Sequence, residues 1–292
     1  MMRKKPMLAY PVSDKPIDYT NKVSMQPKLD GVRCLIQYEK GFNPSLDPAF
    51  DDRDKVVAYS RTGKEWKNIN HILQSLLPFF QKYPNVILDG ELYNHALRDD
   101  FEKIISCVRK TKPNAVDKAE SRRLVQFHCY DIVDETLTFE KRYKFVFDNL
   151  RDCYGVRTVV TRAVGSESLS KVVHQQNLEA GYEGSILRLN DTYQCKRSHS
   201  LRKFKDFHDA EAVLTDWVEG KGKRKGTIGK FMAIDADGNT FGMPVMDNFK
   251  KLQTMFKEMQ GWVGKKATFT YFERTKANSY RHPLFKAIRD YE

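Results

Sequence analysis

The stretch Gln26-Pro27-Lys28-Leu29-Asp30-Gly31-Val32-Arg33 is the most informative part of this sequence. A neutral lysine amine can attack a phosphorus atom and hold a nucleotide through a phosphoramidate bond. Neighbouring cations, a metal or partial burial would lower the pKa of Lys28 and supply that amine. Gly31 permits a tight turn that brings Lys28 towards a ligand. Arg33 can bind phosphate bidentately, which a lysine cannot. The alternative is an ordinary solvated lysine at a strand end.

Four further clusters of charged residues follow along the chain. They are Leu88-Asp89-Gly90-Glu91, Phe127-His128-Cys129-Tyr130-Asp131, Glu183-Gly184-Ser185-Ile186 and Lys203-Phe204-Lys205. Glu91 and Glu183 stand at the ends of strand-like segments, where carboxylates could hold Mg²⁺ through few direct contacts and several waters. Lys203 and Lys205 are two residues apart, so we expect them to share one face of a strand and to neutralise charge on an α-phosphate. Taken singly, each residue could equally be a surface charge.

Together and in this order, these clusters resemble those of ATP-dependent DNA ligases of the compact phage or viral kind, over nearly the whole chain. The resemblance implies that ATP and Mg²⁺ (or Mn²⁺) are the cofactors and that Lys28 is the catalytic nucleophile. It implies that Lys203 and Lys205 act on the α-phosphate. It also implies that Glu183 lies near the metal, and Glu91 near the metal and the AMP ribose.

The resemblance further assigns residues that bind the nucleotide. Tyr130 matches an aromatic residue that stacks on adenine, although the family more often has phenylalanine there. Gln26 lies where the family contacts the adenine edge, often with glutamate. Arg289 matches an arginine that orients the pyrophosphate, but the sequence ends at Tyr291-Glu292 without the lysine that usually follows.

Other residues are assigned to phosphate and DNA. Arg61, in Ser60-Arg61-Thr62-Gly63-Lys64, matches an arginine near the nucleotide and the 5′-phosphate, and could otherwise be a hairpin-turn cation. The positions of Asp30 and Arg33 serve the nick termini and the bound phosphate in the family.

The composition is that of a globular protein with a polyanionic partner. The chain has 292 residues, enough for two domains, and a net charge of +12, which favours nucleic acid. Its five cysteines are widely spaced without a Cys-x-x-Cys pair, so neither a zinc ribbon nor a disulfide framework is predicted. No apolar run is long enough to span a membrane. We therefore expect a monomeric protein in a reducing cytoplasm.

The hydrophobic pattern predicts an α+β fold in two domains. Strands are expected at 32–38, 56–60, 86–92 and 124–133, and helices at 69–80, 100–110, 139–152 and 166–180. The absence of a Gly-x-Gly-x-x-Gly fingerprint argues against a doubly wound sheet. The first domain is placed at residues 1–206. Residues 207–292 have strand signals at 212–218, 227–235 and 266–273 and one helix signal at 247–259, and the resemblance implies a small OB-fold barrel there.

Two segments could contact DNA. The turn 220–226 places Lys221, Lys223, Arg224 and Lys225 within five positions, and it is either a phosphate-binding loop or a solvated turn. The acidic stretch 41–54 is expected to be a surface loop. The sequence leaves open which of the two segments closes around DNA.

The function predicted from these features is the sealing of nicks in duplex DNA through an enzyme-lysyl-AMP intermediate and a DNA-adenylate. An RNA ligase or an mRNA capping guanylyltransferase would use a similar lysine motif. A nucleic-acid-binding module without catalysis is disfavoured, because binding alone does not need the set of Lys28, Glu91, Glu183, Lys203 and Lys205.

Overall fold

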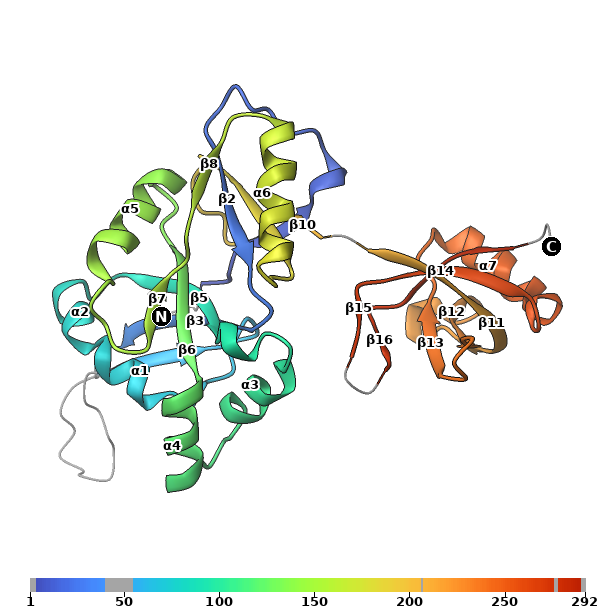
Figure 1. The fold of residues 1–292 in the computed structure, drawn as a ribbon, viewed down its shortest axis with the longest axis horizontal. Helices are drawn as coiled ribbons and strands as arrows, with labels where there is room; N and C mark the ends of the chain where they lie inside the picture. Colours follow the sequence, from blue (N-terminus) through green and yellow to red (C-terminus); the bar gives the residue numbers. More distant parts are fainter. Residues whose placement is uncertain (1–3, 40–54, 206, 276–277, 290–292) are drawn as a thin grey trace. The chain divides into compact units, whose positions relative to one another are not determined.

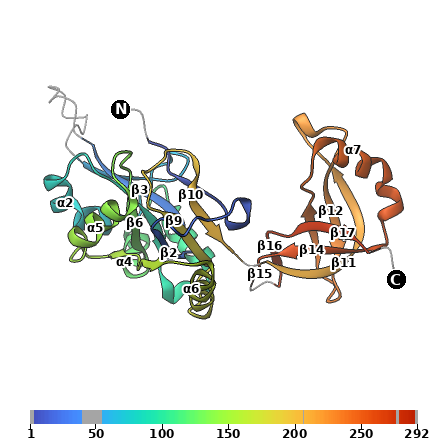
Figure 2. The same ribbon diagram turned by 90° about the horizontal axis from the view of Figure 1, so that it is seen from above.

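The computed structural model describes residues 4–39, 55–205, 207–275 and 278–289. The chain divides into two compact units after Phe204 (Figures 1 and 2). The expected acidic loop at 41–54 lies outside the described residues. Both helices and mainly antiparallel sheets are present, so the predicted α+β class is confirmed.

The first unit contains a five-stranded sheet that carries the lysine motif. Its order is β1 (Leu8–Pro11), β10 (Arg197–Phe204), β9 (Gly184–Leu189), β2 (Val23–Lys28) and β8 (Arg162–Val164). Only β1 and β10 run parallel among these neighbours. Helix α6 (Glu167–Glu179) contacts β2, β8 and β9. Its N-terminus is capped by Ser166, whose hydroxyl accepts a hydrogen bond from the Leu169 amide at 3.2 Å.

A second five-stranded sheet in the same unit carries the acidic clusters. Its order is β4 (Lys55–Tyr59), β3 (Val32–Glu39), β5 (Ile87–Tyr93), β6 (Gln126–Ile132) and β7 (Val156–Thr158). The central strand β5 is antiparallel to both of its neighbours, β3 and β6. Their buried side chains, among them Ile36, Leu88 and Phe127, belong to the largest hydrophobic core of the unit. All four strands predicted in this region are found, with ends shifted by one or two residues.

Five helices pack around the second sheet (Figure 1). They are α1 (Asn70–Ser75), α2 (Leu77–Lys82), α3 (Phe101–Val108), α4 (Ala115–Leu124) and α5 (Phe139–Asn149). The single helix predicted over 69–80 is two helices that meet at Leu76, because Pro78 has no amide hydrogen to continue the hydrogen bonds of α1. Helix α4 was not predicted. It buries almost no apolar side chain and begins with a capping box between Asn114 and Asp117.

The second unit has the strand order of an OB domain. Five strands pair in the order β13 (Thr240–Pro244), β12 (Ile228–Ile234), β11 (His208–Glu219), β14 (Lys266–Tyr271) and β17 (Leu284–Ile288). Helix α7 (Phe249–Glu258) is inserted between the third and fourth strands in sequence. A short hairpin of β15 (Glu273–Arg274) and β16 (Tyr280–Arg281) precedes β17. The predicted strands and helix are all present, and the region resembles the expected OB domain.

Candidate active site

Lys28 is the last residue of β2 and faces a carboxylate. It pairs with Gly184 at the start of β9, and the Glu183 carboxylate just before Gly184 forms an ion pair with the Lys28 ammonium. The Lys28 side chain is 22% exposed and that of Glu183 is 5% exposed. The ammonium can therefore be reached from solvent, while its partner is held below the surface.

The loop after Lys28 is fixed by close packing. Leu29 is buried in a small cluster with Tyr93 and Val159. A Cβ atom on Gly31 would overlap the Leu92 carbonyl oxygen and the Glu91 side chain. The glycine is thus required for close approach to β5. The chain bends at Gly31, and its φ is not positive, so the close approach to β5 rather than a left-handed backbone is what requires glycine here.

A pocket of about 300 Å³ gathers most of the predicted nucleotide-binding residues. Those predicted residues are Gln26, Lys28, Arg33, Arg61, Glu91, Tyr130 and Lys203. Further lining residues were not predicted as site residues, among them Arg188, Arg197 and Leu201. Both sheets of the first unit contribute to this single pocket.

One wall of the pocket is a face of the first sheet. Gln26 and Lys203 both pair with Ile186, and Lys28 pairs with Gly184 two residues away. Because side chains two residues apart on a strand share a face, Gln26 and Lys28 project on the same side. Lys203 is partly buried, and burial lowers its pKa, with the cations Arg197 and Lys28 acting in the same direction. Lys203, Arg197 and Lys28 are therefore three interacting cations that line the pocket.

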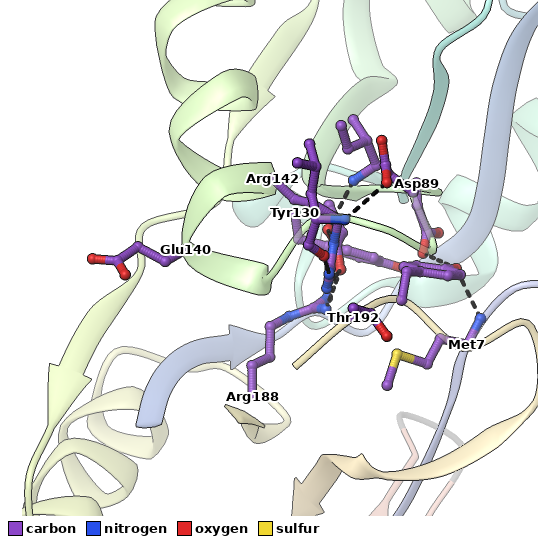
Figure 3. A network of polar contacts seen from close by, with 12 residues as sticks. Met7, Asp89, Tyr130, Glu140, Arg142, Arg188 and Thr192 are labelled. Atoms are coloured by element: carbon purple, nitrogen blue, oxygen red, sulfur yellow. Dashed lines mark hydrogen bonds and ion pairs between the residues drawn. The ribbon is translucent and has the colours of Figure 1, made fainter. Parts of the chain in front are cut away.

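The opposite wall comes from the second sheet and contains an arginine whose charge is balanced by a buried carboxylate. Arg33 donates two hydrogen bonds of 2.6 Å to the buried Asp89 carboxylate. Asp89 also accepts a hydrogen bond of 2.7 Å from the Tyr193 hydroxyl (Figure 3). Asp89 is thus a structural residue that orients Arg33, while the arginine still lines the pocket.

Glu91 has a different environment from Glu183. It pairs with Arg33 across β3 and β5, and burial raises its pKa to about 7, against the opposing effects of Arg33 and Lys28. The Tyr130 hydroxyl lies 3.3 Å from its carboxylate and 3.2 Å from the Gly90 carbonyl oxygen. Glu91 is therefore a carboxyl group whose charge changes near neutral pH.

Tyr130 is held by cations at the pocket. The guanidinium carbon of Arg33 lies 5.2 Å from its ring centroid, and that of Arg188 lies 5.3 Å away. Both distances are in the range of cation–π contacts. The ring is fixed against the second sheet and remains part of the pocket lining.

The expectation that Lys203 and Lys205 share one strand face is wrong. Strand β10 ends at Phe204, and Lys205 lies beyond it in the second unit. There the Lys205 ammonium lies 4.2 Å from the ring centroid of Phe272. Side chains two residues apart share a face only within a strand, and here the chain leaves the sheet between the two lysines.

Three other predicted elements have surroundings of their own. In the second unit, Arg289 forms an ion pair of 2.7 Å with Glu211 and donates to the Thr268 hydroxyl at 3.0 Å. Asp30 follows β2 and is half-buried, but it is not among the described residues that line the pocket. The turn 220–226 joins β11 to β12.

Hydrogen bonds hold that turn in one conformation. The Gly226 amide donates to the Glu219 carboxylate at 2.7 Å, and residues Gly222–Arg224 form one 3₁₀ turn. Its four cations, Lys221, Lys223, Arg224 and Lys225, are exposed. The structure thus leaves these charges available to a ligand or to solvent.

The structure describes no ready-made metal cage. Among the described residues, no group of three or more His, Cys, Asp or Glu side chains is placed to hold an ion. Glu183 and Glu91 nevertheless flank Lys28, and Mg²⁺ is commonly held by one or two carboxylates together with phosphate oxygens and waters. The donor set therefore fits a metal that arrives with a nucleotide.

Beneath the pocket lies a buried network that the sequence did not reveal. Asp131 is fully buried and accepts from Arg142 at 2.7 Å and from Arg188 at 2.6 Å (Figure 3). Arg188 in turn donates to Gln26 at 2.6 Å. The available signal in the sequence was Arg188, a charged residue after the apolar pair Ile186-Leu187 in the segment that follows Glu183.

Comparison with known proteins places this site in a family. Residues 6–205 match the family described as the ATP dependent DNA ligase domain. A DNA ligase of African swine fever virus is 30% identical over 183 residues, which cover 59% of this chain and 42% of the viral protein. The chain therefore spans less than half the length of this curated relative.

Solved structures agree on the fold. A structure reported for Lig E DNA ligases, as DNA binding with a minimal scaffold, has a TM-score of 0.74 and 22% identity, with 99% of this chain and 100% of that chain covered. The ATP-dependent DNA ligase of bacteriophage T7, in complex with ATP, has a TM-score of 0.53 and 16% identity, with 98% of each chain covered. Among the described residues, no helix is long and apolar enough to cross a membrane. With a match over more than half of its length and the lysine pocket inside that match, the chain belongs to the ATP-dependent DNA ligase domain family.

Proposed function

We propose that this protein seals nicks in duplex DNA at the expense of ATP, with Lys28 as the covalent nucleophile. The observation that carries the proposal is the pocket in which Lys28, Lys203 and Arg61 meet Glu91 and a tyrosine ring. Cations, a nucleophilic amine and an aromatic surface are what a nucleoside triphosphate requires of one cavity.

The first step is self-adenylylation. Lys28 must lose a proton before it attacks, and the Glu183 carboxylate that is ion-paired with it is an acceptor for that proton. The Lys28 nitrogen then bonds to the α-phosphorus of ATP, and the bond from that phosphorus to the pyrophosphate oxygen breaks. Lys203 and Arg61 neutralise charge on the phosphate oxygens. A bound Mg²⁺, held by Glu183 and Glu91, would supply further charge neutralisation.

Two transfers to DNA complete the proposed reaction. The 5′-phosphate of the nick attacks the AMP phosphorus and Lys28 leaves, which produces a DNA-adenylate. The 3′-hydroxyl then attacks the activated 5′-phosphate, a phosphodiester forms, and AMP leaves. Each step depends on alignment and charge neutralisation more than on a specialised acid or base. We propose that Lys205 and Arg289 of the second unit assist the nucleotide transfer, and that Asp30 and Arg33 meet the nick.

The decisive experiment is labelling with ATP that carries a radioactive α-phosphate, in the presence of Mg²⁺. We expect the label to become covalently attached to the protein and to be released as AMP when nicked duplex is added, together with a sealed strand. Labelling with GTP instead would indicate a capping enzyme.

The variant Lys28→Ala should lose both covalent label and ATP-dependent sealing, yet it should still seal a pre-adenylylated nick slowly. Lys22→Ala is the matched control, because Lys22 lies at the start of the same strand segment and forms an exposed ion pair with Glu140 at 2.7 Å. Covalent label on Lys28→Ala at the wild-type level would place the nucleophile elsewhere.

A further inference from the structure

Two kinds of group in the pocket orient a nucleotide within it. Lys28, at the end of β2, carries the nucleophilic amine, so the α-phosphate belongs beside it. Tyr130 supplies an aromatic ring on which a base can stack, and Gln26 and Arg188 lie next to it: the Gln26 amide donates to the Tyr130 carbonyl oxygen at 3.2 Å, and the Arg188 guanidinium carbon lies 5.3 Å from the Tyr130 ring centroid. The base of a nucleotide therefore belongs beside Gln26 and Arg188.

Gln26 is held in one orientation. It is 2% exposed. Its amide nitrogen donates to the Thr161 hydroxyl at 2.8 Å and to the Tyr130 carbonyl oxygen at 3.2 Å. Its amide oxygen accepts from Arg188 Nε at 2.6 Å. Both N–H groups of the amide are thus consumed inside the protein.

The partners themselves dictate which way the amide points. A guanidinium can only donate, so the atom facing Arg188 must be the oxygen. A backbone carbonyl can only accept, so the atom facing Tyr130 must be the nitrogen. The free hydrogen-bonding capacity that remains on the Gln26 side chain is a lone pair on its oxygen.

Arg188 cannot easily change its position. It is 4% exposed, and its Nη1 donates to the buried Asp131 carboxylate at 2.6 Å. Its guanidinium carbon also lies 4.8 Å from the Phe139 ring centroid. Arg142 also donates to Asp131, so hydrogen bonds hold both Asp131 and Arg188 in place beside Gln26.

We propose that Arg188 is a positioning residue for base selection, which locks Gln26 as a hydrogen-bond acceptor and thereby favours a 6-aminopurine over a 6-oxopurine. An amino group at position 6 donates to the Gln26 oxygen, whereas an oxo group would present a second acceptor to it. Without Arg188, only the Tyr130 carbonyl oxygen at 3.2 Å still sets the direction of the amide, because the Thr161 hydroxyl can donate as well as accept, so the rotated amide that offers its N–H groups becomes easier to reach. This inference rests on the proposed function, because it concerns the nucleotide that Lys28 captures.

The test compares self-labelling with ATP and with ITP, which has an oxo group at position 6 and lacks the 2-amino group of GTP. For each protein, kcat/KM of covalent labelling is measured with both nucleotides, and the ratio is the readout. We expect Arg188→Met to lower the ATP-to-ITP ratio about tenfold or more, the usual range for one mismatched buried hydrogen bond. Arg188→Lys should also lower the ratio, since it keeps a charge for Asp131 but loses the planar Nε donor.

Arg142→Met is the matched control. It removes the other arginine from Asp131 but does not touch Gln26, so it should leave the ratio at the wild-type value even where stability falls. An unchanged ratio in both Arg188 variants would overturn the inference, as would an equal fall in Arg142→Met. If wild-type protein took no label from either nucleotide, the proposed function itself would be wrong.

Discussion

At the scale of single residues, the two carboxyl groups beside Lys28, Glu183 and Glu91, differ in their charge state. Glu183 is paired with the Lys28 ammonium, whereas burial raises the pKa of Glu91 to about 7. Folding must therefore place Glu91 in surroundings that disfavour its charge. A group that is unfavourable for stability and lies in a ligand pocket is commonly there for function.

The Glu91 pKa leads to a prediction about stability and pH. An unfolded glutamate has a pKa near its ordinary value of 4.5, so between that pH and 7 the folded state binds more protons than the unfolded state. The free energy of unfolding must then fall as pH rises across this interval. Glu91→Gln removes the effect and should be more stable than wild type above pH 7, by on the order of 2–3 kcal/mol, with little difference at pH 4.

Urea unfolding at several pH values measures this difference. Glu102→Gln is the control, because Glu102 is an exposed residue of α3. Its difference from wild type should stay constant from pH 5 to pH 8. A flat profile for Glu91→Gln as well would show that Glu91 is ionised normally in the folded protein.

At the scale of elements, the start of β9 determines where Lys28 and Glu183 meet. Gly184 has a φ of +144°, and a Cβ atom there would overlap the Phe204 carbonyl oxygen of β10. The strand can thus begin directly after Glu183 only with a glycine at this position. The position of the Glu183 carboxylate beside Lys28 therefore depends on the absence of a side chain at position 184.

Gly184→Ala should therefore destabilise the protein by about 2 kcal/mol or more, since it combines backbone strain with overlap against another strand. It should also reduce self-labelling, because Glu183 would be displaced from Lys28. Gly165→Ala provides the comparison. A Cβ atom on Gly165 meets no atom within 4 Å, so this variant should unfold like wild type. Equal thermal stability of the two variants would contradict the argument.

At the scale of the whole molecule, the net charge of +12 favours binding to a polyanion. We propose that the exposed turn 220–226 supplies part of the DNA contact. Backbone contacts make affinity depend on salt, because each phosphate that is neutralised releases counterions. Arg61 also lines two further hollows of the first unit, which would suit the same role.

Replacing the four cations of the turn by glutamine should weaken binding to nicked duplex and flatten its salt dependence. Each lost phosphate contact should reduce the slope of log affinity against log salt by about 0.9. Self-labelling with ATP should not fall in parallel, because the turn is not assigned to the nucleotide. Fluorescence anisotropy with a labelled nicked duplex at several salt concentrations measures the slope.

The control for the turn is an equal change of charge elsewhere in the second unit. The residues replaced in this control are Lys250, Lys251, Lys257 and Lys265, all of which are exposed. Four substitutions there should alter the slope less than the four in the turn. Identical slopes for both sets would mean that only the net charge matters, and that the turn is solvated.

The residues alone predict the family-like order of charged clusters, the α+β class and a domain boundary after residue 206, while the two compact units divide after Phe204. These predictions follow from local features of the sequence: a lysine motif, carboxylates after apolar strands, and apolar residues that recur about every 3.6 residues in helices and every two residues in strands. Strands of the second sheet were predicted to within two residues for the same reason. Residues from distant segments, such as Gln26 and Tyr130, could be assigned to one pocket only through the resemblance.

Only the tertiary structure decided which groups meet. It ends β10 at Phe204, so Lys205 does not belong to the strand that carries Lys203. It shows that Gly31 serves close approach to β5, and it splits the helix predicted over 69–80 at Leu76. It also joins Gln26 to Arg188, 162 residues apart in sequence, in a buried hydrogen bond. Such contacts arise from strand pairing and burial between remote segments, and no local pattern of residues records them.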